Sequence, residues 1–432
     1  MKPFLTPTSA RKSQAPLQLF IYDERKGNKE GHEDDKLLAY FPATTPHDDK
    51  LITVGLAQAL STFIATFDGD SDTQTLETEN CWWCIRRFEP GIRVGAVSDG
   101  ESGPEKIRGG SLNVLLQDIY SWIRLLHGSV NKVLQEDPSA ARARISLQAV
   151  IDTWGKILTA PKSQEKKDRE SPLGVSRFGA TPYLPLPRDA LLSVQYLANS
   201  LMEMPSVVGA MFCHELYLVW STFSREDTRA IYSFCSNSNK LAGSKIVSIG
   251  AQLVRLSIDE VDTPVWLQPL QKGHLTAIVL LDTNLVEDPR KEVGGLLEVV
   301  GTRSDHINQS AVQQLISMEA FHISGYRYVY LDQCSEFGCA SPSKKVRHLS
   351  KKTVRMLRGV QNAVGVCESI DEGCRDYEVM AKGEHGGWVV VREGGSRMLS
   401  VAMDQLPDAN LEQISDHIAK LCDSHFPGAF DM

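Results

Sequence analysis

The 432-residue sequence lacks any apolar run that approaches the ~20 residues of a membrane span. Its N-terminus, Met1–Pro7, has no signal-peptide layout. Position 2 has no myristoylation glycine, and the C-terminus has no prenylation box. These absences predict that any contact with a membrane is peripheral or made through a partner.

Strong basic charge is also missing. The formal net charge is −8, so the chain as a whole has no nucleic-acid footprint. Hydrophobic residues make up 42% and charged residues 23%, which is typical of a folded chain and not of a disordered one. Nine cysteines, an odd number, without a signal peptide indicate reduced thiols in the cytosol.

Catalytic motifs are absent as well. The sequence contains no P-loop, no nucleotide-binding glycine fingerprint, no nucleophile elbow and no clustered histidines. The pairs Gly294-Gly295 and Gly394-Gly395 lack the context of a phosphate loop, so we expect both to be turns. We therefore expect no catalytic residue, no cofactor and no metal site.

The motif Cys81-Trp-Trp-Cys84 has the spacing of a redox or metal pair. A redox pair needs a helix N-terminus to lower the thiol pKa, whereas this motif lies in the predicted strand 80–88. A zinc site would need a second pair of similar spacing, and no other cysteines supply it well. We expect a buried strand, with a cytosolic thiol enzyme as the alternative.

The stretch from Leu17 to Phe67 has the clearest local pattern. Aromatic residues favour strands over 17–22 and 37–41, with a charged loop between them. Pro42 cannot donate to a strand ladder and ends the second strand. Asp48 or Asp49 can cap the helix that we expect over 51–67.

This helix has two distinct faces. One carries large apolar residues at three- and four-residue steps: Ile52, Leu56, Leu60, Phe63 and Phe67. The opposite face is small: Val54, Ala57, Gln58, Ser61 and Ala65. Small residues permit close approach by another element, and both core packing and a partner interface are consistent with that.

The remainder of the chain repeats the alternation of strands and helices. Two further strands and two helices complete a first unit, and a charged break over 161–180 follows. A hairpin and a helix capped by Ser224, with Asp227 at the capping-box position, open a second unit. Three short strands joined by glycine turns, then a helix over 410–426, indicate a third.

The order of these motifs resembles the Ccz subunit family of the Mon–Ccz complex. The first unit contributes "FIYDERKG", an acidic loop and "LITVGLAQALSTFIATF"; the second contributes "VWS" and "DTRAIY"; the third contributes "WVVVR" from Trp388. Related chains place an aromatic-Pro-Leu-Asp motif after the break, whereas this sequence has Tyr183-Leu-Pro-Leu-Pro before Pro187-Arg-Asp189. The resemblance covers nearly the whole chain and includes the tri-longin relatives Inturned and the Hermansky–Pudlak proteins.

The resemblance implies an α+β fold of three longin-like domains, each a mainly antiparallel sheet packed with helices. We expect a disordered tail over 1–16 and a first longin domain over 17–135. A helix and charged linker over 136–186, a second longin domain over 187–335 and a third over 336–432 complete the expected organisation.

The resemblance also implies a function. It predicts a subunit of a heterodimeric guanine nucleotide exchange factor for the late-endosomal and vacuolar Rab GTPase of the Rab-seven type. The obligate partner would be a Mon-type longin subunit. Longin domains commonly pair through small helix faces, so Val54, Ala57, Gln58, Ser61 and Ala65 are the predicted partner interface. The alternative is a tri-longin interaction scaffold in lysosome-related organelle biogenesis or planar polarity, without exchange activity.

Two charged segments are candidate contact sites. The acidic loop Glu24–Asp35 is either a solvated loop or a surface for a basic partner. A basic run near 344–352 can approach anionic lipid at about 1 kcal/mol for each charge, or it can simply be a solvated helix start. The predicted membrane-contact residues are Lys344, Lys345, Arg347, Lys351 and Lys352.

Overall fold

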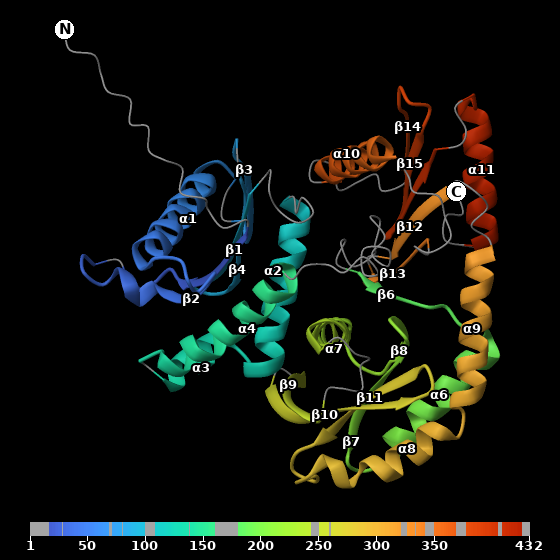
Figure 1. The fold of residues 1–432 in the computed structure, drawn as a ribbon, viewed down its shortest axis with the longest axis horizontal. Helices are drawn as coiled ribbons and strands as arrows, with labels where there is room; N and C mark the ends of the chain where they lie inside the picture. Colours follow the sequence, from blue (N-terminus) through green and yellow to red (C-terminus); the bar gives the residue numbers. More distant parts are fainter. Residues whose placement is uncertain are drawn as a thin grey trace. The chain divides into compact units, whose positions relative to one another are not determined.

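The computed structural model describes residues 17–27, 29–68, 71–79, 81–99, 109–137, 139–159, 180–242, 250–258, 261–320, 326–332, 334–341, 350–368, 377–404 and 408–425. The chain divides into two compact units, residues 1–161 and 162–432, each of which is treated by itself below (Figure 1). The expected tail over 1–16 and residues 160–179 of the expected linker lie outside the described residues.

The first unit is built on an antiparallel sheet of five strands in the order β2-β1-β5-β4-β3. The strands are β1 Leu17–Asp23, β2 Leu37–Phe41, β3 Thr73–Glu77, β4 Cys81–Glu89 and β5 Ile92–Asp99. The helices are η1 Glu33–Lys36, α1 His47–Asp68, α2 Gly109–His127, α3 Val130–Glu136 and α4 Ala141–Thr159.

Helices cover both faces of this sheet (Figure 1). Helix α1 packs on the face that carries Phe20 and Tyr40, whereas α2 and α4 pack on the other. On that second face α4 approaches β2 closely, because a Cβ at Gly155 would lie 2.3 Å from the ring of Phe41. Only glycine permits this approach, which places α4 in the first domain.

The second unit contains two sheets, in the orders β8-β7-β11-β10-β9 and β14-β15-β16-β12-β13-β6. The strands of the first are β7 Val207–His214, β8 Tyr217–Ser221, β9 Gln252–Ile258, β10 Val261–Lys272 and β11 Leu275–Asp282. Those of the second are β6 Thr181–Pro182, β12 Tyr326–Asp332, β13 Phe337–Ala340, β14 Tyr377–Lys382, β15 Trp388–Gly394 and β16 Arg397–Met403.

Seven helical segments accompany these two sheets in the described part of the unit. They are α6 Arg188–Met202, α7 Arg225–Ala242, η4 Pro289–Lys291, α8 Val293–Gly301, α9 Ser304–Ala320, α10 Lys351–Glu368 and α11 Leu411–His425. Helix α7 begins as expected: Asp227 N–H donates to Ser224 Oγ at 3.1 Å, and the Ser224 hydroxyl donates to the Asp227 carboxylate at 2.8 Å.

The three sheets share one topology. Numbered within its own domain, each runs 2-1-5-4-3, with a helix between the second and third strands. That helix is α1 in the first domain, α7 in the second and α10 in the third. The expected architecture of three α+β domains with mainly antiparallel sheets is therefore confirmed.

Two expected domain boundaries shift in the structure. Strand β12 pairs with β13 and β16, so the third domain begins at Tyr326 and not at residue 336. Helix α4 packs on β1, β2 and α2, so it belongs to the first domain and not to a linker starting at 136.

Some local elements also differ from the sequence-based predictions. The turn expected at Gly294-Gly295 is wrong, because both glycines lie in helix α8. Strands β3, β9 and β13 were not expected, and β3 and β13 are only five and four residues long. The turn expected at Gly394-Gly395 is present between β15 and β16.

Candidate functional site

The small face of α1 lies against the sheet. Val54 and Ala57 are fully buried and Ser61 is 4% exposed. The sheet fills most of the space beneath the helix with large rings, including Phe20 and Tyr40, so the fully buried positions of α1 are small, while Leu60 packs against this cluster only in part. The predicted partner interface is therefore wrong at Val54, Ala57 and Ser61, which are core residues.

The other two residues of that predicted interface lie at its edges. Gln58 is half-buried, and its Oε1 accepts a hydrogen bond from Lys36 Nζ at 2.8 Å. Ala65 is also half-buried. Neither residue presents a contact surface of its own.

The large apolar face of α1 points away from the sheet. Ile52 is 66% exposed, Leu56 46%, Phe63 62% and Phe67 77%. The rings of Phe63 and Phe67 meet edge to face, with their centroids 5.0 Å apart. Contiguous exposed apolar surface on a folded domain is typical of an interaction site, so these four residues, the outer face of α1, form the candidate functional site.

Helix α1 also corrects an expectation about membrane spans. Within the described residues, His47–Phe67 is the one helix long and apolar enough to cross a membrane by length and composition. Its burial of Val54 and Ala57 on the sheet is the packing that an α+β domain requires. Composition alone thus does not distinguish this docked helix from a span.

The corresponding helix of the second domain is covered. In α7, Ile231 is fully buried, and Phe234 and Cys235 are also buried. Arg229 of α7 pairs with Glu336 of the third domain, with 3.7 Å between Nη1 and Oε2. This chain therefore already contains one such helix in contact with a neighbouring longin-like domain.

One edge of the first sheet is closed. The side-chain amide of Gln148, on α4, accepts from Tyr40 N–H at 3.0 Å and donates to Tyr40 O at 2.8 Å. These two bonds satisfy the backbone groups that an added strand would use. A partner strand is thereby excluded from β2 at this point, while β3 forms the other edge.

The acidic loop is anchored beside the start of α1. Asp34 accepts from His47 at 2.6 Å, and Asp35 lies 3.2 Å from His32. The Arg144 guanidinium donates to the backbone oxygen of Asp34 at 3.2 Å. The loop is therefore positioned by the first domain, and both interpretations made of it stay open.

The cysteine pair does not have the properties of a reactive site. Burial raises the pKa of the Cys84 thiol to about 11, and burial together with Asp99 raises the pKa of Cys81. A redox or nucleophilic thiol needs the opposite shift. The buried-strand interpretation holds, because both residues lie in β4.

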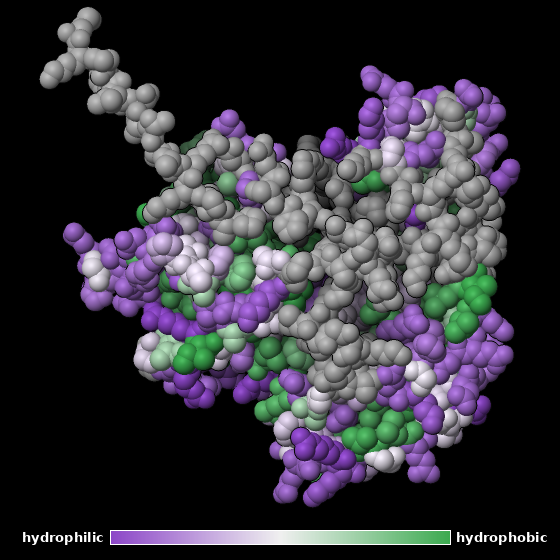
Figure 2. All heavy atoms as spheres, in the orientation of Figure 1, coloured by the Kyte–Doolittle hydropathy of each residue, from purple (hydrophilic) through white to green (hydrophobic). Residues whose placement is uncertain are grey.

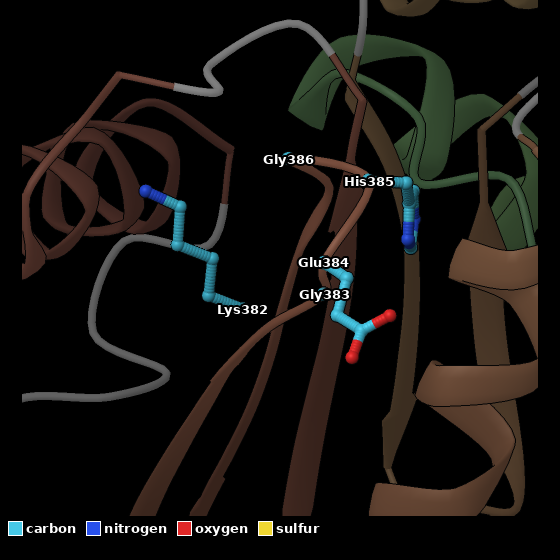
Figure 3. Close-up of a pocket in the computed structure, with 5 residues that line it drawn as sticks. All are labelled: Lys382, Gly383, Glu384, His385 and Gly386. Atoms are coloured by element: carbon cyan, nitrogen blue, oxygen red, sulfur yellow. The ribbon is translucent and has the colours of Figure 1, made fainter.

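A shallow, open hollow of about 650 Å³ lies at the β14–β15 turn. It is lined by Lys382, Gly383, Glu384, His385 and Gly386. Figure 3 shows the side chains of Lys382 and His385 on opposite sides of this turn. The Lys382 ammonium lies 5.1 Å from the ring centre of Trp388, so the polar groups do not converge on one ligand position.

A cluster of polar groups next to this turn holds the start of α10. The Thr353 hydroxyl contacts His385 Nε2 at 2.7 Å and also bonds to Asp404. Ser350 caps the helix and donates its N–H to Asp404 at 2.6 Å. In a catalytic triad the histidine lies between the hydroxyl and the carboxylate, whereas here the fully buried Thr353 occupies that position.

No group of three or more metal-ligating side chains capable of holding an ion occurs among the described residues. Two histidine rings lie near each other in the second domain, where the ring centroids of His214 and His274 are 5.9 Å apart. His214 is 1% exposed, and neither of its ring nitrogens has a hydrogen-bond partner. Burial, the largest cause, and the nearby His274 lower the pKa of His214, against the opposing effect of Glu215.

The predicted membrane-contact residues are only partly described. Lys344, Lys345 and Arg347 lie outside the described residues. Lys351 and Lys352 form the first turn of α10, and Lys352 is exposed. Contact with a membrane at this position stays a prediction.

A comparison with known proteins identifies the first domain. The model of the first longin domain of INTU, CCZ1 and HPS4 matches residues 17–128. This range holds the whole first sheet together with α1 and α2. The outer face of α1 is therefore a feature of a longin domain.

Relatives from plants and animals align with nearly the whole chain. Vacuolar fusion protein CCZ1 homolog B of Arabidopsis thaliana is 24% identical over 96% of this chain and 97% of its own length. The rice homologue is 24% identical over 98% and 99%, and that of Danio rerio 22% over 96% and 95%. The chain is thus similar along almost its entire length to the CCZ1 vacuolar fusion proteins, in agreement with the resemblance to the Ccz family indicated by its motifs.

Proposed function

We propose that this chain is a subunit of a heterodimeric guanine nucleotide exchange factor that acts in vacuole fusion. Its target is the late-endosomal and vacuolar Rab GTPase, and its obligate partner is a Mon-type longin subunit. The name of the relatives as vacuolar fusion proteins supports the process. The three domains of one longin-like topology support an exchange platform that acts through its surfaces.

The outer face of α1 is the observation that carries this proposal. Four large apolar side chains of this face are between 46% and 77% exposed. We expect another protein surface to bury them in the assembled complex. We assign that cover to a longin domain of the partner, because α7, the counterpart of α1, meets a longin-like domain in this chain.

The charge around α1 favours a protein over a lipid surface at this face. Asp48 and Asp49 lie in the first turn of α1, and η1 beside it carries Glu33, Asp34 and Asp35. An anionic bilayer repels such a group of carboxylates. A protein partner that presents an uncharged apolar helix face is not subject to this electrostatic repulsion.

Exchange in this proposal works by differential binding. The platform binds a GTPase conformation in which the nucleotide and its Mg²⁺ are held weakly. Each tenfold loss of nucleotide affinity requires about 1.4 kcal/mol of preference for that conformation. Surface complementarity supplies this free energy, so no acid, base or nucleophile is needed.

Membrane contact forms a second, separate part of the proposal. The basic start of α10, with Lys351 and Lys352, is the surface that approaches anionic lipid. In this proposal the protein acts on the cytoplasmic side, peripherally on late endosomes and the vacuole or lysosome.

The test is an exchange assay on the assembled pair. The full chain is co-expressed with a Mon-type subunit, purified as a complex and mixed with the Rab loaded with a fluorescent guanine nucleotide. The proposal expects nucleotide release that is faster than with either subunit alone. A stable pair that binds the Rab without accelerating release would overturn the exchange function and favour the scaffold.

A further inference from the structure

The Tyr183-Leu-Pro-Leu-Pro motif lies between the second and third domains. The two residues before this motif, β6, add to the edge of the third sheet and run parallel to β13. Thr181 N–H donates to Glu336 O at 2.8 Å, and Tyr183 N–H donates to Gly338 O at 2.9 Å. Alternate backbone donors of this segment thus pair with the third domain.

The same segment then pairs with the second domain. Leu184 N–H donates to Leu218 O in β8 at 2.9 Å, and Tyr183 forms a parallel bridge to Leu218. β8 is the edge strand of the second sheet, and β13 would be the edge strand of the third sheet if β6 were not paired with it. The two strands have corresponding positions in the shared topology. Within four residues, the chain therefore hydrogen-bonds to the edges of two different sheets.

Side chains of this segment enter both cores. Ala180 packs against the third-domain cluster that contains Leu331, and Leu186 packs against the second-domain cluster that contains Phe212. Leu184 between them is fully buried. The segment is consequently part of the interior of both domains.

One aromatic contact and the prolines fix its conformation. The rings of Tyr183 and Phe337 are stacked, with centroids 5.3 Å apart and an angle of 8° between their planes. Pro182 and Pro185 lack a backbone N–H and restrict the chain to extended geometry, which lowers the entropy lost on docking. Such a sequence is suited to pairing on alternate residues.

We propose that residues 180–186 are an interdomain clasp, and that the facing edges of β8 and β13 form an acceptor site for an extended Tyr-Leu-Pro-Leu segment. The clasp joins the second and third domains into one cooperative unit. Without it, both edges would expose unpaired backbone groups. The acceptor site is a property of the second unit and does not depend on the proposed exchange function.

The first test is hydrogen exchange on the full chain with two variants of the clasp. Tyr183→Pro removes both the N–H that bonds to Gly338 O and the stacked ring, whereas Tyr183→Ala removes only the ring. Tyr196→Ala is the matched control, because Tyr196 is 54% exposed on α6 and lies outside the clasp.

Exchange is followed in peptides that cover residues 180–186, 217–221 and 336–340. The proline variant is expected to exchange about tenfold faster in all three, the factor that about 1.4 kcal/mol corresponds to. The control is expected to exchange like the wild type. Unchanged protection in Tyr183→Pro would overturn the clasp. If the proline variant is unfolded as a whole, the clasp is tested with the alanine variant, by its hydrogen exchange in the same three peptides.

The second test adds the clasp in trans. A peptide with the sequence of residues 180–187, ATPYLPLP, is titrated into the folded variant whose three segments exchange faster. Restored protection at 217–221 and 336–340, with no effect of a scrambled peptide, is the expected result. A failure of the native peptide to restore protection at saturating concentration would overturn the acceptor site.

Discussion

The two phenylalanines at the end of α1 allow the docking role of this helix to be tested quantitatively. Phe63 is 62% exposed and Phe67 77% in the isolated chain. Full burial of a phenylalanine contributes about 2 kcal/mol, so burying these exposed fractions contributes about 3 kcal/mol together. A partner that covers both rings loses that contribution when both are changed to alanine.

The double variant Phe63→Ala/Phe67→Ala is therefore expected to bind the partner subunit about 100-fold more weakly, since each 1.4 kcal/mol is about tenfold in affinity. Its own unfolding free energy should change by less than about 0.5 kcal/mol, because neither ring is in the core. Calorimetric or surface-based titration of the purified partner measures the affinity, and thermal melting measures the stability.

Ile145→Ala is the matched control, because Ile145 is 73% exposed on α4 of the same domain and lies away from the outer face of α1. It should leave the partner affinity unchanged. Equal affinities for wild type, control and double variant, with all three folded, would refute a docking role for α1. A large loss of melting temperature in the double variant would instead contradict the exposed placement of the rings.

Three further outcomes follow from burial. Ala57→Leu overfills the space beneath α1, where Ala57 is fully buried, and should destabilise the chain by about 1–3 kcal/mol in a denaturant melt. Cys84, with its pKa raised to about 11, should react with iodoacetamide slowly at pH 8 and only speed up toward that pKa; fast labelling at pH 8 would revive the thiol alternative. For His214, the lowered folded pKa means that stability is unaffected above the unfolded value of about 6.5 and falls as pH drops below it, because only the unfolded chain takes up the proton. His214→Phe should flatten this part of the stability profile relative to wild type, and an unchanged slope would show that His214 is protonated equally in both states.

Much of the fold is encoded locally. Aromatic strands such as 17–22, the helix capped by Ser224 and the glycine turns of the third domain all produce the elements that they predict. Strand β3 was missed because this edge strand buries little of its surface and has little apolar periodicity. The early start of the third domain was missed because β12 is assigned by its pairing with β16, which is 65 or more residues away in sequence.

The orientation of α1 shows a different limit of sequence reasoning. An apolar stripe from Ile52 to Phe67 establishes that the helix has a buried face in the assembled state, but not which neighbour buries it. The rings of Phe20 and Tyr40 occupy the volume under the helix, where Val54, Ala57 and Ser61 are buried and Leu60 is partly buried against the same cluster. Because large side chains of the sheet fill this space, the helix residues that face it are mostly small. Which residues face each other depends on the tertiary structure and cannot be read from the helix sequence alone.

The closed sheet edges have a consequence for how three similar domains share one chain. Sheets with the same topology have edges that can recognise one another, and tandem copies at high local concentration invite wrong pairing. Here the edge at β2 is occupied at Tyr40 by the amide of Gln148, and those at β8 and β13 are occupied by residues 180–184. In each domain, the edge strand at one end of the sheet is therefore covered in part by residues of the same chain. The strand at the other end of the sheet is β3, β9 or β14. An added strand would therefore find more free backbone groups at β3, β9 or β14 than at these covered positions of β2, β8 and β13.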